Sequence, residues 1–387
     1  MPTRQNTLER PGTTRAAKAD FRPDIQALRA LAVGLVVFHH LWPTVLTAGF
    51  VGVDAFFVIS GYLITAQLAH EIDGTGRIRI ADFFARRVRR LLPAALLVLA
   101  SVVVAVHTLV AQDRWADNAR QVLASALYSQ NWLLGADPVD PARVTATAHY
   151  WSLSVEEQFY LLWPLLLLLL FKLRAPFARL AGVAGLGLVS LAWCVHLTEA
   201  DPAAAYFITP VRVWEFAIGA VIALAGTKPV LPRAVANGVS LLGFTALVGS
   251  AVHFTGLTPY PGAAALVPTV GTALVIAAGT GQQRQWHTTV ASSRPVQLLG
   301  DISYSLYLWH WPLLILAPLA VSDGVLDLPV RLGILASALV LAYTTKRLVE
   351  DPVRAWPPLA ASTRLTFVAM TAGLATVCLA AGSLLWT

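Results

Sequence analysis

The stretch "LRALAVGLVVFHHLWP", residues 28–43, is apolar along almost its whole length, yet it carries Arg29, His39 and His40. A helix that spans a membrane needs about 20 mostly apolar residues, and the apolar run 25–46 is long enough. Ionisable side chains are costly inside a membrane unless they line a polar cavity or serve a function. The stretch therefore predicts a membrane helix that contributes polar side chains to a site.

The composition of the whole chain agrees with a membrane protein. Of the 387 residues, 57% are hydrophobic and only 13% are charged, whereas soluble domains carry about 25% charged residues. Ten further apolar runs follow: 50–70, 91–111, 149–171, 177–197, 206–226, 233–252, 262–280, 296–320, 328–349 and 365–386. We therefore predict an all-α polytopic membrane protein with about eleven transmembrane helices in the cell membrane.

The charges predict the orientation and the organisation of the chain. Lysine and arginine concentrate in alternate connecting segments, beginning with the N-terminal tail and 71–90, and such segments lie in the cytoplasm. The N-terminus is then cytoplasmic, and eleven spans place the C-terminus outside. We divide the chain into a basic cytoplasmic tail (1–24), a membrane domain (25–357) and an extra C-terminal transmembrane helix (358–387).

Arg29 and His40 are expected on one face of their helix. At about 100° per residue, the eleven steps between them fall within about 20° of three full turns, with a rise of about 16.5 Å. His39 points about 100° away. Arg29 either extends to the headgroups or binds a phosphate. His40 either makes an interhelical hydrogen bond or, as a neutral imidazole, accepts a proton from a hydroxyl. Acyl-coenzyme A, with phosphates at one end and a thioester at the other, fits such a stripe.

The segment "FFARRVRRLLPA", residues 83–94, is the second basic motif. Its four arginines immediately precede the expected start of the third span. Backbone N–H groups at a helix start, with arginines beside them, form an anion site. The alternative is a plain positive-inside anchor.

Two segments carry acids into the membrane. In "GFVGVDAFFVISGYLIT", residues 49–65, Asp54 either orients a histidine, binds a polar acceptor or stabilises a helix N-terminus, whereas Ser60 and Gly61 favour close helix packing. In "HYWSLSVEEQFYLLWP", residues 149–164, the adjacent Glu156 and Glu157 point to different faces, so at least one faces the interior. A salt bridge to an arginine such as Arg212 is the alternative.

The segment "SYSLYLWHWPLLI", residues 303–315, frames His310 with Trp309 and Trp311. Aromatic and hydroxyl side chains of this kind form sugar-binding walls, although an interfacial aromatic belt gives the same pattern. Cys194 and Cys378 lie inside apolar runs and have no metal-ligand spacing, so we predict no metal.

These stretches, together with "VEDPVR" (349–354), occur in an order that resembles the acyltransferase 3 family of integral-membrane O-acyltransferases. The resemblance runs from about residue 21 to 357. It implies acyl transfer from cytoplasmic acyl-coenzyme A to a hydroxyl of a glycan or a glycosylated metabolite. It selects His40 over His39 as the catalytic residue, either as general base or as a transient acyl carrier. It assigns the donor's phosphates to Arg29, Arg86, Arg87 and Arg90.

The remaining expectations concern the acceptor. With His40 we place Asp54 and Glu157 among the catalytic residues. The residues expected to bind the acceptor are Glu156, His149, Trp151, Tyr307 and His310. The size of the chain is similar to the macrolide 3-O-acyltransferase branch, so we prefer an acetyl or propionyl donor and a glycosylated small molecule such as a macrolide antibiotic. The alternatives are a cell-envelope or exopolysaccharide glycan and, in another class, a transporter without chemistry. Membrane lipids are expected partners, and nucleic acid is not.

Overall fold

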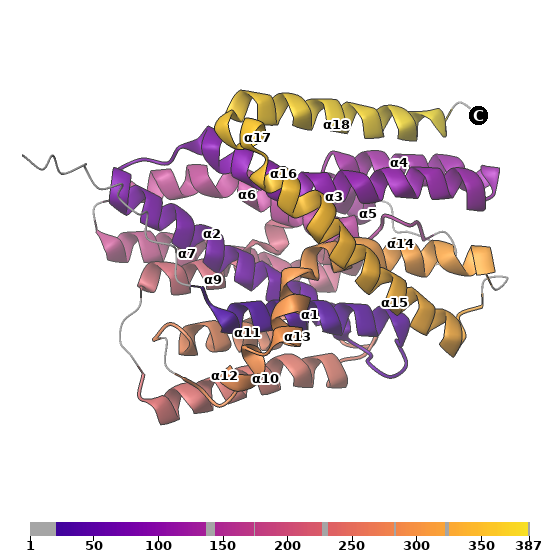
Figure 1. The fold of residues 1–387 in the computed structure, drawn as a ribbon. Coiled ribbons are helices and arrows are strands. Elements are labelled where there is room, and N and C mark those ends of the chain that lie inside the picture. Colours follow the sequence, from indigo (N-terminus) through magenta and orange to yellow (C-terminus); the bar gives the residue numbers. More distant parts are fainter. Residues whose placement is uncertain are drawn as a thin grey trace, which may run out of the picture.

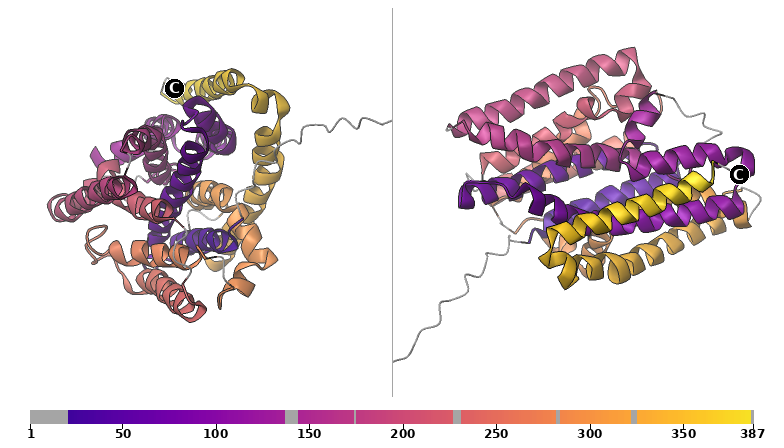
Figure 2. Two further views of the ribbon diagram at one scale, coloured as in Figure 1. Left: turned by 90° about the vertical axis from the view of Figure 1, so that its left-hand side faces the viewer. Right: turned by 90° about the horizontal axis from the view of Figure 1, so that it is seen from above.

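The computed structural model describes residues 21–136, 144–173, 175–226, 231–281, 284–321 and 325–385, and within these ranges it is helical without strands. Most of the predicted tail 1–24 lies outside the described residues. The long helices run roughly along one axis (Figure 1). In the end-on view, the N-terminal helix lies in the interior of the bundle and the C-terminal helix lies on its periphery (Figure 2).

Nine described helices are long and apolar enough to cross a membrane. They are α1 (Pro23–Leu41), α2 (Gly52–Thr75), α3 (Ile80–Leu109), α6 (Tyr150–Phe171), α7 (Pro176–Ala200), α10 (Arg233–His253), α14 (Ser303–Val321), α15 (Leu328–Thr345) and α18 (Thr363–Ser383). Each coincides with a predicted span. The other two predicted spans contain shorter apolar helices, α9 (Val213–Ala225) and α11 (Leu266–Ala278). The chain is a multi-pass membrane protein, while the count of eleven and the sides of the termini stay predictions.

Shorter helices connect or cover the spans. They are α4 (Trp115–Ala126), α5 (Gln130–Ala136), α8 (Pro202–Phe207), α12 (Thr288–Ala291), α13 (Arg294–Asp301), α16 (Asp351–Ala355) and α17 (Pro357–Ala361), with a π-helical turn at Lys346–Glu350. α4 packs against α3 and α18, and α5 packs against α6 and α8. The long connection after the third span is therefore folded along the bundle where it is described.

The outer surface of the bundle is apolar. Large side chains such as Leu188 and Val189 on α7, and Leu241 and Leu242 on α10, are more than half exposed. In a soluble protein such a surface would drive association, but against lipid it is the favourable arrangement. One group of polar side chains lines a cavity between α1, α2, α3, α6 and α14, where the site lies.

α2 and α9 pack closely because glycines face each other's backbone. A Cβ at Gly61 would overlap the carbonyl of Phe216, and a Cβ at Gly219 would overlap the carbonyl of Val58. Small residues let membrane helices approach until van der Waals packing and backbone contacts stabilise the pair. The packing role predicted for Gly61 is confirmed, and the contact fixes α2 beside the site.

We predict that Gly61→Ala destabilises the protein whereas Gly34→Ala does not. Both glycines lie inside long helices, but a Cβ at Gly34 meets no atom within 4 Å. Overpacking costs about 1–3 kcal/mol, whereas alanine in an unhindered helix is favoured by up to about 1 kcal/mol. Thermal unfolding in detergent should give a lower Tm for Gly61→Ala and an unchanged or higher Tm for Gly34→Ala. Equal Tm values for the two variants would contradict this account of the packing.

Candidate active site

Two histidines from different helices form the centre of the site. His40 Nδ1 on α1 lies 3.1 Å from His310 Nε2 on α14. The two rings are stacked, with centroids 5.2 Å apart and an angle of 16° between their planes. The ring of Trp311 meets His40 edge-on at 4.7 Å. His40 is half-buried and its Nε2 has no hydrogen-bond partner among the described residues.

The neighbouring His39 has a separate environment. Its Nδ1 lies 2.8 Å from the carbonyl oxygen of Leu46, and its ring meets Phe50 edge-on. These contacts connect His39 to the segment that follows α1 and not to His310.

Arg29 contacts the same helix as His40. Its guanidinium donates to Ser303 Oγ on α14 at 2.9 Å and to Gln26 Oε1 at 3.1 Å. The prediction that Arg29 and His40 share one helix face is confirmed, since both reach α14. Ser303 lies beside Arg29 and His310 beside His40, so α1 and α14 run in the same direction.

Pro312 shapes this part of α14. Proline has no N–H, so the carbonyl four residues earlier, that of Leu308, loses its helical donor. His149 Nε2 lies 3.2 Å from that carbonyl oxygen. His149 is only 4% exposed, and its Nδ1 is buried without a partner among the described residues. A free acceptor atom thus lies near the pair, because the His149 and His310 ring centroids are 5.6 Å apart.

The arginines of α3 do not lie at a helix start, which corrects the sequence prediction. α3 begins at Ile80 and continues through Pro93, as membrane helices often do when neighbours compensate for the missing bond. The backbone N–H groups beside these arginines are therefore used within the helix. Any anion binding here depends on the side chains.

The four side chains have different surroundings. Arg86 pairs with Glu71 at 3.3 Å. Arg89 donates to the carbonyl of Leu359 and to Thr366 Oγ1. Arg87 lies over the ring of Tyr160, 4.9 Å from its centroid. No hydrogen bond or ion pair reaches Arg90 within the described part of the chain.

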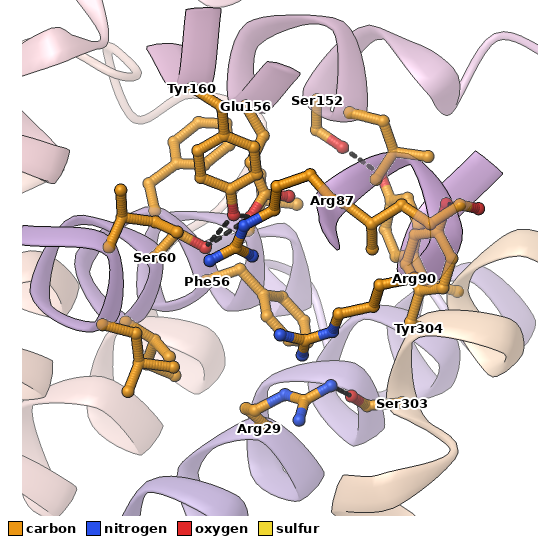
Figure 3. Close-up of a pocket in the computed structure, with 18 residues that line it drawn as sticks. Arg29, Phe56, Ser60, Arg87, Arg90, Ser152, Glu156, Tyr160, Ser303 and Tyr304 are labelled. Carbon is orange, nitrogen blue, oxygen red and sulfur yellow. Dashed lines mark hydrogen bonds between the residues drawn. The ribbon is translucent and has the colours of Figure 1, made fainter. Parts of the chain in front are cut away.

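Arg87, Arg90 and Arg29 line one internal cavity of about 90 Å³ (Figure 3). The polar groups around it also include Ser60, Ser152, Glu156, Tyr160, Ser303, Tyr304 and Tyr307, and the remainder are apolar side chains such as Phe56 and Phe57. Figure 3 shows the guanidiniums of Arg29 and Arg90 directed into the same space, where they repel one another. Like charges this close favour an anion between them.

A smaller cavity continues from this one. It shares Arg29, Arg90 and Tyr304 with the first cavity. Its other lining residues are Asp301, Lys346, Glu350, Asp351 and Arg354. The arginine end of the site therefore has a charged mouth in which four cationic groups face three acids.

Glu156 and Glu157 face different surroundings, as predicted for adjacent helical residues. Glu156 lines the cavity and accepts hydrogen bonds from Ser60 and Tyr160. Glu157 lines an apolar groove between α3, α6 and α18, and it has no hydrogen-bond or ion-pair partner among the described residues. Glu156 thus belongs to the site in this structure, whereas the catalytic role predicted for Glu157 stays a prediction without a contact to His40.

Tyr307 connects the cavity to the histidines. Its hydroxyl donates to the carbonyl of His149 at 2.9 Å and lies 2.6 Å from Ser152 Oγ. The same ring is 5.3 Å from the His310 ring. The inner end of the cavity is therefore separated from the histidine pair by one side chain.

Asp54 lies in a separate buried cluster. Arg212 is 1% exposed and contacts Asp54 and Glu215, each at 3.1 Å. Tyr260 donates to the other oxygen of Asp54 at 2.5 Å. The partners of Asp54 are thus an arginine and a tyrosine, and the predicted alternative of Arg212 paired with Glu156 or Glu157 is not formed.

Trp151 borders this cluster. It contacts Tyr206 at 5.0 Å and Phe207 at 5.4 Å between ring centroids, and the Arg212 guanidinium lies 5.8 Å from its ring. The predicted role of Trp151 in acceptor binding stays a prediction, as it is 7% exposed here.

Sequence reasoning missed several polar residues of the cavity. Ser60 was assigned to packing, and Tyr160 and Ser303 were not singled out. The spacing of Glu156 and Tyr160, one helical turn apart, could have indicated Tyr160. Ser60 and Ser303 gave no signal, because a lone serine in an apolar helix is equally typical of packing.

The described residues contain no cluster of three or more histidine, cysteine or acidic side chains arranged to hold a metal ion.

The fold and the site define a multi-pass membrane protein with a basic cavity beside a histidine pair. A profile of the acyltransferase domain matches residues 22–347. The chain therefore belongs to the acyltransferase 3 family. α18 lies beyond the matched region.

Curated relatives agree with this family. The peptidoglycan O-acetyltransferase OatA of Listeria monocytogenes is 31% identical over 88% of this chain and 57% of its own length. A putative O-acetyltransferase of Staphylococcus aureus is 30% identical over 89% of this chain and 59% of its own length. The O-acetyltransferase OatA of S. aureus is 30% identical over 86% of this chain and 57% of its own length. The chain thus spans less than two thirds of these relatives, and no solved structure matches it.

We predict that Arg212→Met strongly destabilises the protein. The substitution would leave Asp54 and Glu215 buried without their cation, and breaking a buried ion pair costs about 3–5 kcal/mol. Arg233→Met, at the exposed start of α10, is the matched control. Thermal unfolding should give a much lower Tm for Arg212→Met only. A Tm like that of the control would show that the cluster does not stabilise the fold.

Proposed function

We propose that this protein transfers an acetyl group from acetyl-coenzyme A to a hydroxyl of a cell-envelope glycan, with His40 as the general base. The observation that carries this proposal is the pair of guanidiniums, Arg29 and Arg90, that face one cavity. Tyr307 lines the same cavity and contacts His310, the partner of His40. Family membership supports acyl transfer over transport without chemistry.

The donor's charge suits the arginine end of the site. A phosphate accepts charge-assisted hydrogen bonds from guanidinium groups and would separate Arg29 from Arg90. Neither this cavity, of about 90 Å³, nor the smaller charged mouth, of about 40 Å³, can enclose a nucleotide. The nucleotide would therefore lie outside the mouth, with its phosphates reaching in to Arg29 and Arg90. The narrow pantetheine arm would extend inward along α1 and α14. The rise of about 16.5 Å from Arg29 to His40 suits an arm that separates phosphates from a thioester.

The chemistry follows from the free nitrogen of His40. Its Nε2 would take the proton of the acceptor hydroxyl while the hydroxyl oxygen forms a bond to the thioester carbonyl carbon. The carbon–sulfur bond then breaks, and the proton passes from Nε2 to the departing thiolate. The products are the ester and free coenzyme A. The ring of Trp311, which meets His40 edge-on, would limit the access of water and hence thioester hydrolysis.

The relatives' names favour the glycan acceptor over the macrolide that we preferred from sequence. All three carry the name O-acetyltransferase, one of them as putative, and one is by name a peptidoglycan O-acetyltransferase. The same names favour acetyl over propionyl. The acceptor would approach from the histidine end, where His149 Nδ1 offers a buried acceptor atom for a hydroxyl.

We expect purified protein in lipid nanodiscs to release coenzyme A from acetyl-coenzyme A only when a glycan acceptor is present, and His40→Ala to abolish this release. Peptidoglycan fragments, a macrolide glycoside and no acceptor form the three arms, and mass spectrometry identifies the ester. Loss of a general base typically lowers the rate by about 10²–10⁴-fold. Full turnover by His40→Ala would refute the assignment of His40, and esterification of the macrolide alone would refute the glycan.

Arg90→Ala is expected to raise the KM for acetyl-coenzyme A by about 10–100-fold, because one hydrogen bond to a charged group contributes about 1.5–3 kcal/mol. Arg77→Ala, which removes an exposed arginine just before α3, is the control and should leave KM near the wild-type value. The test compares acetyl-coenzyme A with acetylpantetheine, which lacks the nucleotide. An equal effect of Arg90→Ala on both donors would show that Arg90 does not bind the donor's phosphates.

A further inference from the structure

The hydrogen bonds around His310 determine where its proton lies. His310 Nδ1 is 2.6 Å from the carbonyl oxygen of Tyr307, one turn earlier in α14. A carbonyl oxygen can only accept, so Nδ1 carries the proton. His310 is 2% exposed, and no carboxylate among the described residues bonds to its ring to support a cation. The ring is therefore neutral, and its Nε2 is a hydrogen-bond acceptor.

The proton position on His310 also determines the proton position on His40. Since His310 Nε2 accepts, His40 Nδ1, at 3.1 Å, must donate. The neutral ring of His40 then carries its proton on Nδ1, and its lone pair lies on Nε2. The tautomer of a histidine is set by the hydrogen bond that its other nitrogen makes. A backbone carbonyl of α14 thus determines, through one intervening ring, which nitrogen of His40 is free to act as a base.

We propose that His310 is a positioning residue that holds His40 in the Nδ1–H tautomer and aims Nε2 at the reacting hydroxyl. The inference rests on the proposed function of His40. It replaces the sequence prediction that His310 binds the acceptor, since both ring nitrogens of His310 are already engaged. Packing also restrains the orientation of the His40 ring. The His310 ring is stacked against it, and the Trp311 ring meets it edge-on.

The loss of kcat expected when His310 no longer holds the tautomer of His40 can be judged from known enzymes. In the serine-protease triad, replacing the group that sets the histidine tautomer lowers kcat about 10⁴-fold while the geometry is kept. Partners of this kind around metal-bound histidines contribute about 10–100-fold. A neutral acceptor such as His310 should lie between these limits, at about 100-fold or more in kcat.

Two substitutions of His310 separate hydrogen bonding from packing. In His310→Gln the amide oxygen can take the place of Nε2 and accept from His40 Nδ1. His310→Phe keeps a ring of similar size but has no acceptor. His39→Gln is the matched control, because His39 neighbours His40 in sequence but bonds to Leu46.

The experiment combines kinetics with a direct reading of the tautomer. We expect His310→Phe to lower kcat for coenzyme A release by about 100-fold with little change in the KM for acetyl-coenzyme A. His310→Gln should retain kcat within about tenfold, and His39→Gln should resemble wild type. In protein labelled with ¹⁵N-histidine in lipid bilayers, solid-state NMR should show His40 as Nδ1–H in wild type and His310→Gln. That signal should be lost in His310→Phe, and comparison with His40→Gln assigns it.

The outcomes distinguish this inference from the proposed function. Wild-type kcat in His310→Phe, equal losses in His310→Phe and His310→Gln, or an Nε2–H tautomer of His40 in wild type would each overturn the inference. If His40 is Nδ1–H in wild type but His40→Ala turns over normally, the proposed function fails and the positioning role in catalysis fails with it. If His40 is essential and His310→Phe is fully active, only the inference fails.

Discussion

A polar side chain inside an apolar bundle must find its partner within the protein. Two such pairs of polar side chains connect α1 and α14 along the interface between these helices. Arg29 donates to Ser303, and His40 contacts His310 about 16.5 Å further along the helix axis. Desolvated polar groups are costly when unpaired, so these two bonds restrict the register of the helices. The cavity lies beside this line of contact, and its shape depends on that register.

Positive charge is left unpaired at the cavity because some arginines have acidic or hydrogen-bonding partners within the protein and others do not. Arg86 and Arg89 are neutralised or capped by Glu71, Leu359 and Thr366, whereas Arg90 is not. Arg212 shows the opposite case, with two acids and no role at the cavity. Buried ion pairs of this kind add little to stability when intact but are damaging when broken. The contrast separates charged groups whose partners lie within the fold from charged groups that remain available to a ligand.

The sequence carried enough information for the spans and for one face of the first helix. Hydropathy located nine long helices and two short ones because lipid imposes the same requirement on every span. Helix periodicity placed Arg29 and His40 on one face because both lie on the same helix. Contacts between helices had no such local signal. The register of α2 against α6 brings Ser60 to Glu156, and nothing in either segment alone encodes it.

The differences between the sequence predictions and the structure have physical causes as well. Pro93 was interpreted as a helix start, but neighbouring helices let α3 continue through it. Asp54 was considered a partner for a histidine, yet Arg212 lay beyond what spacing along the chain could reveal. His310 was predicted to bind the acceptor because tryptophans flank it, and this role stays a prediction. Its real neighbour is His40, and Pro312, which frees the Leu308 carbonyl for His149, was the overlooked sign that α14 has a special role.

In the proposed function, donor phosphates bound at Arg29 and Arg90 place the thioester beside His40. The most direct test is a cryo-electron microscopy structure of the protein in nanodiscs with acetonyl-coenzyme A, in which a stable ketone replaces the thioester. We expect phosphate density in contact with both guanidiniums. We expect the ketone carbon on the His40 side of Tyr307, close enough for a hydroxyl to bridge it to Nε2 of His40. Phosphates bound away from Arg29 and Arg90, or a ketone remote from His40, would contradict it.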